Sequence, residues 1–105
     1  MPAETAPQVE TVEKTHLAPR WHVVLLNDDD HTYDYVIEML GAVFAHPIEQ
    51  AFAMAREVDL NGRVIVDTTS RERAELKQEQ VHAFGKDWRI DGCAGSMTAV
   101  IEPAE

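Results

Sequence analysis

The feature that most constrains the fold is a short apolar run that ends abruptly in polar turn residues. Residues 21–26 read Trp-His-Val-Val-Leu-Leu, a run that is rich in β-forming residues and short enough for a buried strand. The four residues that follow are Asn-Asp-Asp-Asp, whose side chains favour turns by hydrogen-bonding the nearby backbone. A helix should begin directly afterwards, because Thr32 is a suitable N-cap and Asp34 falls in the first turn. The sequence therefore predicts a strand, a polar turn and a helix in close succession.

Apolar residues at helical spacing predict two consecutive amphipathic helices after this turn. The second of them begins at Pro47, because proline suits the first position of a helix, and it ends at Asn61-Gly62, because glycine suits the C-terminal cap. The first apolar face consists of Val36, Leu40, Val43 and Phe44, and the second of Ile48, Ala51, Phe52, Ala55 and Val58. Two such faces are expected to pack on a sheet.

The second half of the chain predicts a strand, a helix, a loop and a final strand. Residues 63–66 and 96–101 have strand-like composition, and Thr69 with Glu72 fits a capping box that opens a third helix. Three glycines make residues 85–96 a predicted loop. The expected order is β-α-α-β-α-β, which indicates an α+β fold with a small three-stranded antiparallel sheet and three helices packed on it.

Length and composition limit the number of domains and the classes of partner that we expect. At 105 residues we expect one domain, over residues 20–105, preceded by a flexible, proline-containing tail over residues 1–19. Lys+Arg 9 against Asp+Glu 19 gives a net charge of −10, which argues against nucleic acid or an anionic membrane as a partner. The chain has no long apolar run, no signal-peptide pattern and a single cysteine, Cys93. We therefore expect a cytoplasmic protein without an internal disulfide.

The acidic turn predicts a site for a cation. Asp28, Asp30 and His31 are possible oxygen and nitrogen ligands of a metal ion, which leaves a metal-dependent hydrolase as one alternative. They form neither a calcium-binding loop nor a zinc-type ligand set, so we predict no metal and no cofactor. The same carboxylates suit an ammonium group as well. A plain protein-interaction domain without a ligand pocket is the remaining alternative.

The segment from Trp21 to Asp29, followed by residues 36–40, resembles the ClpS family of protease adaptors. Further similar segments occur in the family's order. They are Glu49-Gln50-Ala51, Gly62, Ala74-Glu75-Leu76-Lys77 with Gln80-Val81, and Glu102-Pro103-Ala104. The resemblance covers about residues 20–104 and implies a non-enzymatic adaptor. Such an adaptor binds N-degrons, which are proteins with a bulky apolar N-terminal residue, and hands them to a Clp AAA+ unfoldase and its peptidase.

The resemblance also implies residue roles in a monomeric adaptor. The ammonium group and the first backbone atoms of the substrate would meet Asn27, Asp28 and Asp59. The pocket for the first side chain would be formed by His31, Tyr33, Val36, Ala55, Val58 and Met97. Glu72 and Lys77 stand at positions that dock on the N-terminal domain of the unfoldase, and the tail resembles an extension that the unfoldase engages.

Several of these positions depart from the better-known members of the family. Tyr33 stands where a methionine is usual, Ala55 replaces a pocket methionine, and Asp59 replaces a histidine. Asp30 and His31 differ from the usual aromatic-then-threonine pair. The preferred N-terminal residue is therefore left open by the sequence.

Overall fold

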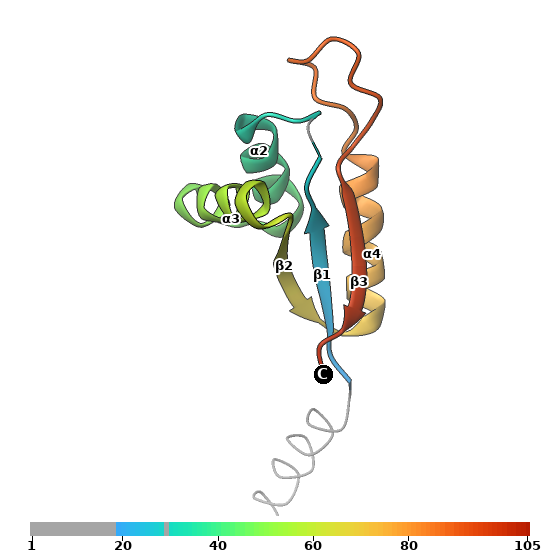
Figure 1. The fold of residues 1–105 in the computed structure, drawn as a ribbon. Coiled ribbons are helices and arrows are strands. Elements are labelled where there is room, and N and C mark those ends of the chain that lie inside the picture. The colour runs from blue at the N-terminus through green and yellow to red at the C-terminus, as the bar shows by residue number, and fades with distance from the viewer. Residues whose placement is uncertain (1–18, 29) are drawn as a thin grey trace, which may run out of the picture.

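The computed structural model describes residues 19–28 and 30–105, and its elements follow the predicted β-α-α-β-α-β order (Figure 1). The elements are β1 (Trp21–Leu26), α2 (Tyr33–Phe44), α3 (Ile48–Asn61), β2 (Arg63–Thr69), α4 (Arg71–Ala83) and β3 (Thr98–Pro103). The predicted α+β fold is thus confirmed. The predicted tail lies outside the described residues, Pro19 apart.

The sheet has β1 at its centre, with β2 and β3 antiparallel on either side. Val23 is paired with Asp67 and Val24 with Ile65, so Val66 is the extra residue of a β-bulge. At the other end of β1, Leu26 pairs with both Arg63 and Thr98. The last residue of β1 and the first residues of β2 and β3 therefore lie side by side at one end of the three strands.

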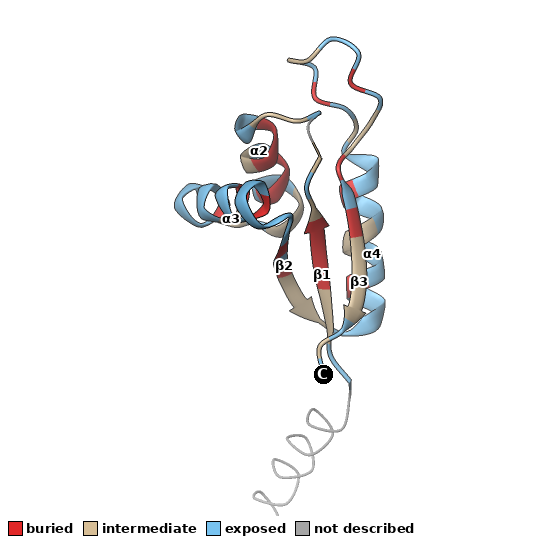
Figure 2. Cartoon of the chain, viewed as in Figure 1, coloured by how far each residue is buried: buried red, intermediate tan, exposed pale blue. Residues whose placement is uncertain are grey.

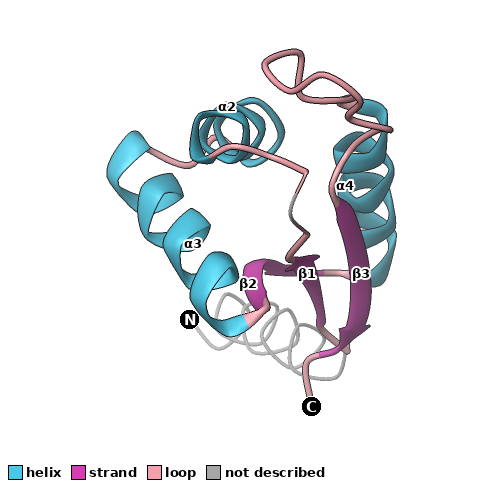
Figure 3. Ribbon diagram, turned by 45° about the horizontal axis from the view of Figure 1, so that its top comes forward, coloured by secondary structure: helices cyan, strands magenta, loops and turns pink. Residues whose placement is uncertain are grey.

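All three helices lie on the same face of this sheet (Figure 3). Side chains of alternate strand residues point toward the helices, as the twofold period of a strand requires. The core is formed by Val23 and Leu25 of β1, Val64 and Val66 of β2, Ala99 of β3, and residues of the inner helix faces. Burial follows this arrangement, with the middle of β1 enclosed and much of the outer surface of α3 and α4 exposed (Figure 2).

The inward face of α3 is narrower than its sequence predicts. Ala51, Ala55 and Val58 are buried, but Ile48 is 72% exposed and Phe52 46% exposed. Phe52 follows Ala51 directly and therefore points about 100° away from it around the helix. The small alanines let α3 approach α2 and β2, and the larger apolar residues remain outside.

The start of α4 differs from the prediction by one residue. Ser70 is the N-cap, and its hydroxyl accepts a hydrogen bond from the Arg73 N–H at 3.3 Å. Thr69 instead belongs to β2, where it pairs with Trp21. The predicted capping box was therefore wrong because β2 runs three residues further than its apolar segment. Among the described residues, no helix is both long enough and apolar enough to cross a membrane.

Candidate functional site

Four chain segments converge at the end of the sheet where the central strand β1 stops. These segments are the turn after β1, the start of α2, the end of α3 and the residues that precede β3. The Asn27 N–H donates to the Gly62 carbonyl at 3.0 Å and ties the turn to the end of α3. Gly62 adopts a left-handed conformation (φ 87°), which lets the chain pass directly from α3 into β2. The antiparallel pairing thus brings together residues that are far apart in the sequence.

A cavity of about 170 Å³ opens at this junction. It is lined by Asn27, Asp28, His31, Tyr33, Val36, Ala55, Val58, Asp59 and Met97. The structure therefore gathers around one cavity all the residues that the sequence nominates for the ammonium group and the first side chain. Glu72 and Lys77, the docking candidates, lie elsewhere, on α4.

The lining combines an apolar wall with a polar mouth. Val36, Ala55, Val58 and Met97 are buried, and they come from α2, α3 and the segment before β3. Asn27 and Asp59, by contrast, are exposed, and the side chain of Asp28 is 31% exposed. A ligand with one apolar group and one positively charged group fits this division.

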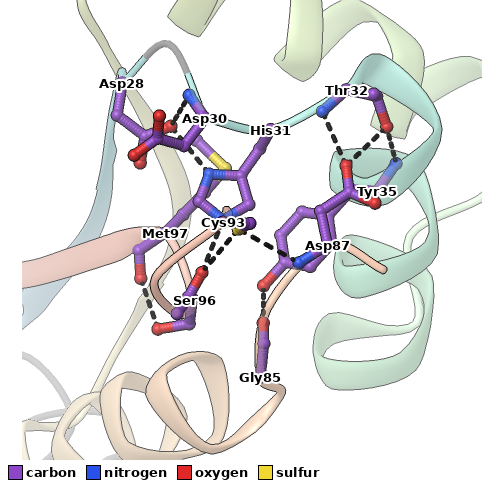
Figure 4. A network of polar contacts seen from close by, with 11 residues as sticks. Asp28, Asp30, His31, Thr32, Tyr35, Gly85, Asp87, Cys93, Ser96 and Met97 are labelled. Atoms are coloured by element: carbon purple, nitrogen blue, oxygen red, sulfur yellow. Dashed lines mark hydrogen bonds and ion pairs between the residues drawn. The ribbon is translucent and has the colours of Figure 1, made fainter. Parts of the chain in front are cut away.

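The carboxylate of Asp28 is held by two hydrogen bonds to the same oxygen, Oδ1. The Asp30 N–H donates to it at 3.0 Å, and Nδ1 of His31 lies 2.7 Å from it (Figure 4). Nε2 of His31 lies 2.8 Å from the carbonyl oxygen of Gly95, in the loop before β3. The imidazole thus links the turn after β1 to that loop.

Tyr33 and Asp59 close one side of the cavity mouth. The Tyr33 hydroxyl donates to Oδ2 of Asp59 at 2.7 Å, and this hydrogen bond to the carboxylate raises the pKa of Tyr33. The ring of Tyr33 also packs at a tilt on Phe52, with 5.8 Å between the ring centroids. The exposed Phe52 therefore extends the aromatic rim of the cavity outward along α3.

Asp87 holds the loop that follows α4 against the start of α2. Its side chain is fully buried, and Oδ2 accepts from the Thr32 N–H at 2.9 Å and the Thr32 hydroxyl at 2.8 Å. Oδ1 accepts from the backbone N–H and the guanidinium of Arg89, each at 3.1 Å. Burial alone would raise the pKa of Asp87, but these hydrogen bonds outweigh it and lower the pKa to about 2. Thr32 is also the N-cap of α2, so Asp87 fixes the helix that bears Tyr33 and Val36.

Sequence reasoning missed both Asp87 and the environment of Cys93. The thiol of Cys93 is buried, accepts from the Asp87 N–H at 3.4 Å, and donates to the Gly95 carbonyl at 3.3 Å. Its sulfur also lies 3.5 Å from Nε2 of His31. A glycine-rich loop has no hydrophobic period, so the sequence contains no signal for this buried network.

The metal alternative has no ligand set in the part of the chain that the structure describes. No group of three or more His, Cys, Asp and Glu side chains is arranged there to hold a metal ion. Asp28 and His31 instead hydrogen-bond each other, and the second nitrogen of His31 faces a backbone carbonyl.

The α4 side of the molecule bears the docking candidates. Glu72 is exposed in the first turn of α4. Lys77 is half-buried, because its Nζ donates to the Val43 carbonyl at 2.6 Å and lies 5.7 Å from the ring centroid of Phe44. A second, shallower cavity of about 400 Å³ runs between α2 and α4. It is lined by Ala42, Val43, Lys77, Gln80, Ala83 and Phe84.

Comparisons with known proteins agree with one another. The sequence model of the family described as "ATP-dependent Clp protease adaptor protein ClpS" matches residues 16–89. The chain is 39% identical over 77 residues to the ATP-dependent Clp protease adapter protein ClpS of Vibrio cholerae, across 71% of this chain and 73% of that protein. It is 35% identical over 86 residues to the ClpS protein of Nautilia profundicola, across 82% and 87% of the two chains.

A solved structure matches as well. Agrobacterium tumefaciens ClpS2 bound to L-phenylalaninamide superimposes with a TM-score of 0.70 at 25% identity. The match covers 81% of this chain and 96% of that one.

Proposed function

Since this chain belongs to the ClpS family of ATP-dependent Clp protease adaptor proteins, we propose that it recognises N-degrons and delivers them to a Clp AAA+ unfoldase. The substrate would be a protein whose free N-terminal residue has a bulky apolar side chain. The observation that supports this proposal is the single cavity with an apolar wall and a mouth lined by Asn27, Asp28 and Asp59.

The polar mouth suits an N-terminal ammonium group. An ammonium group has three hydrogen-bond donors. The side-chain carbonyl of Asn27 and the carboxylates of Asp28 and Asp59 are hydrogen-bond acceptors. An ammonium–carboxylate pair at 4 Å has a Coulomb energy of about 4 kcal/mol at an effective dielectric constant near 20, and desolvation removes much of it. Selectivity is the greater gain, because an acetylated N-terminus is uncharged and leaves the acceptors unpaired.

The apolar wall suits one bulky side chain. A cavity of about 150 Å³ accommodates benzene, so the observed volume of about 170 Å³ accepts a group the size of a phenyl ring. Burial of a Leu or Phe side chain contributes about 1.5–3 kcal/mol. The ligand of the similar Agrobacterium protein, L-phenylalaninamide, combines a free α-amino group with such a ring.

The proposal is tested with pairs of fluorescent peptides that differ only in N-terminal acetylation. Peptides that begin with Phe, Leu, Tyr or Trp are titrated with the protein, together with a peptide that begins with Asp. We expect the free-amine aromatic or Leu peptides to bind and their acetylated twins to bind at least about tenfold more weakly. Equal affinity for both members of every pair would refute N-degron recognition.

We place the unfoldase-docking surface on α4, around Glu72 and Lys77. Glu72 is exposed and available to a basic partner, whereas Lys77 connects α4 to the end of α2 through the Val43 carbonyl. Pull-down of a Clp unfoldase N-terminal domain should be weakened by Glu72→Arg. It should be unchanged by Glu57→Arg, a control on the exposed surface of α3. Equal capture by the two variants would show that docking occurs elsewhere.

A further inference from the structure

We propose that His31 is a positioning residue for the ammonium site. Through Nδ1 it holds Oδ1 of Asp28 and so leaves the other carboxylate oxygen for the ligand at the cavity mouth. This inference rests on the function proposed above, and it adds a residue whose ring acts on the substrate through Asp28.

The imidazole of His31 is fixed from several directions. Its side chain is only 3% exposed, and its ring packs against that of Tyr35 with 4.5 Å between the centroids. Its Nε2 is held by the Gly95 carbonyl at 2.8 Å, with the sulfur of Cys93 at 3.5 Å (Figure 4). A ring so enclosed has one orientation, which makes it a rigid support for whatever it contacts.

Asp28 is the group that gains from this support. Its Oδ1 already receives the Asp30 N–H and faces Nδ1 of His31. Its side chain nevertheless remains 31% exposed, so the carboxylate is reachable from solvent. Restriction of the carboxylate before binding removes rotamer freedom that would otherwise be lost on binding, and this raises affinity.

The geometry requires a proton on Nδ1. Both ring nitrogens face oxygen acceptors, namely the Asp28 carboxylate and the Gly95 carbonyl. A neutral imidazole donates at one nitrogen only, whereas the imidazolium form donates at both. Either the imidazolium or the Nδ1–H tautomer supports Asp28, and the Nε2–H tautomer does not.

Two substitutions separate the contact with Asp28 from the contact with the loop. In His31→Asn the amide nitrogen stands close to the position of Nδ1, so the donor to Asp28 is kept and the contact with Gly95 is lost. In His31→Gln the amide nitrogen stands near the position of Nε2, so the reverse holds. Thermal unfolding of both variants establishes that each is folded.

Affinity for a Phe peptide with a free N-terminus is then compared with affinity for its acetylated twin. Because His31 also lines the cavity, both substitutions can weaken binding of the free-amine peptide, and we expect His31→Gln to bind it about tenfold more weakly than His31→Asn. The acetylated peptide should bind both variants equally. Equal losses in the two variants, or a greater loss in His31→Asn, would overturn the proposal and assign His31 a role in anchoring the loop.

A measurement on the unaltered protein tests the same claim without any variant. The ¹⁵N chemical shifts of the His31 ring, recorded at neutral pH, should show a proton on Nδ1. A bare Nδ1 with a proton on Nε2 alone would contradict the proposal. If the wild-type protein binds neither peptide, the proposed function itself fails, and the NMR result still tells whether His31 supports Asp28.

Discussion

The Tyr33 hydroxyl donates to Oδ2 of Asp59 at 2.7 Å and joins the first turn of α2 to the last turn of α3. Both residues line the cavity, so the two helices that form much of its wall are linked at its mouth. The link also restrains one of the carboxylates that we propose for ammonium binding.

This relationship predicts different effects for two substitutions at the mouth. Tyr33→Phe removes one exposed hydrogen bond and should weaken binding of a free-amine Phe peptide by no more than about threefold. Asp59→Ala removes a negative charge from the ammonium site and should weaken the same peptide by about tenfold. Fluorescence anisotropy measures both. A greater loss of affinity in Tyr33→Phe than in Asp59→Ala would show that Asp59 acts only as a hydrogen-bond partner of Tyr33.

Ala55 predicts how the size of the first side chain is limited. It is buried in the cavity wall, so Ala55→Met would place three additional heavy atoms in a space of about 170 Å³. We expect affinity for a Phe peptide to fall at least about tenfold, since most of the ring burial worth about 1.5–3 kcal/mol is lost. Ala53→Met, at an exposed position of α3, is the control and should bind normally. Unchanged affinity in Ala55→Met would mean that the side chain binds elsewhere.

The lowered pKa of Asp87 predicts that the folded protein loses stability in acid. Its folded-state pKa is about 2, below the value of about 3.9 expected in the unfolded chain, so its contribution is present above pH 4 and disappears as the pH falls through 2. At pH 7, Asp87→Asn should lower the free energy of unfolding by about 2 kcal/mol, because charged hydrogen bonds to Thr32 and Arg89 are lost.

The check on Asp87 is the difference between the wild-type and Asp87→Asn unfolding temperatures, measured from pH 7 to pH 2. We expect this difference to shrink below pH 4. If the two unfolding temperatures differed by the same amount from pH 7 to pH 2, Asp87 would not be held as a carboxylate in the folded protein.

The left-handed conformation of Ala45 predicts that a glycine at this position would stabilise the protein. It caps α2 in the left-handed conformation (φ 60°, ψ 29°), which costs a residue with a Cβ about 1–2 kcal/mol relative to the right-handed helix. Because glycine loses more entropy on folding, Ala45→Gly should raise the free energy of unfolding by a smaller amount, about 0.5–1 kcal/mol. Ala53→Gly, inside α3, should lower it by about 1 kcal/mol. Urea denaturation that shows equal losses in both variants would contradict this account of the cap.

The fold was predictable because its elements have clear hydrophobic periods and are separated by strong turn residues. The β1 run and the Gly62 cap appear at their expected places, whereas α3 begins one residue later than predicted, at Ile48, with Pro47 as its N-cap. The details that failed depend on tertiary packing. Ile48 and Phe52 have the spacing of an inward face, but only Ala51, Ala55 and Val58 fit against α2 and β2.

The site was predictable in a different way. The acidic turn after β1 predicts a cation site from the residues alone, and the family resemblance nominates positions on other elements. In the structure these positions line one cavity. Neither source points to Asp87, Cys93 or the ring contacts of His31. Those groups meet only because the loop before β3 folds back on the start of α2, and that contact has no counterpart in local sequence.

The most direct test of the account is a thermodynamic cycle on Asp28. Wild type, Asp28→Ala and the neighbouring control Asp30→Ala are each titrated with a free-amine Phe peptide and its acetylated twin. We predict that wild type and Asp30→Ala prefer the free amine by at least about tenfold and that Asp28→Ala, still folded, has almost no preference. A folded Asp28→Ala protein that retains the full preference would contradict the claim that this carboxylate binds the N-terminal ammonium group.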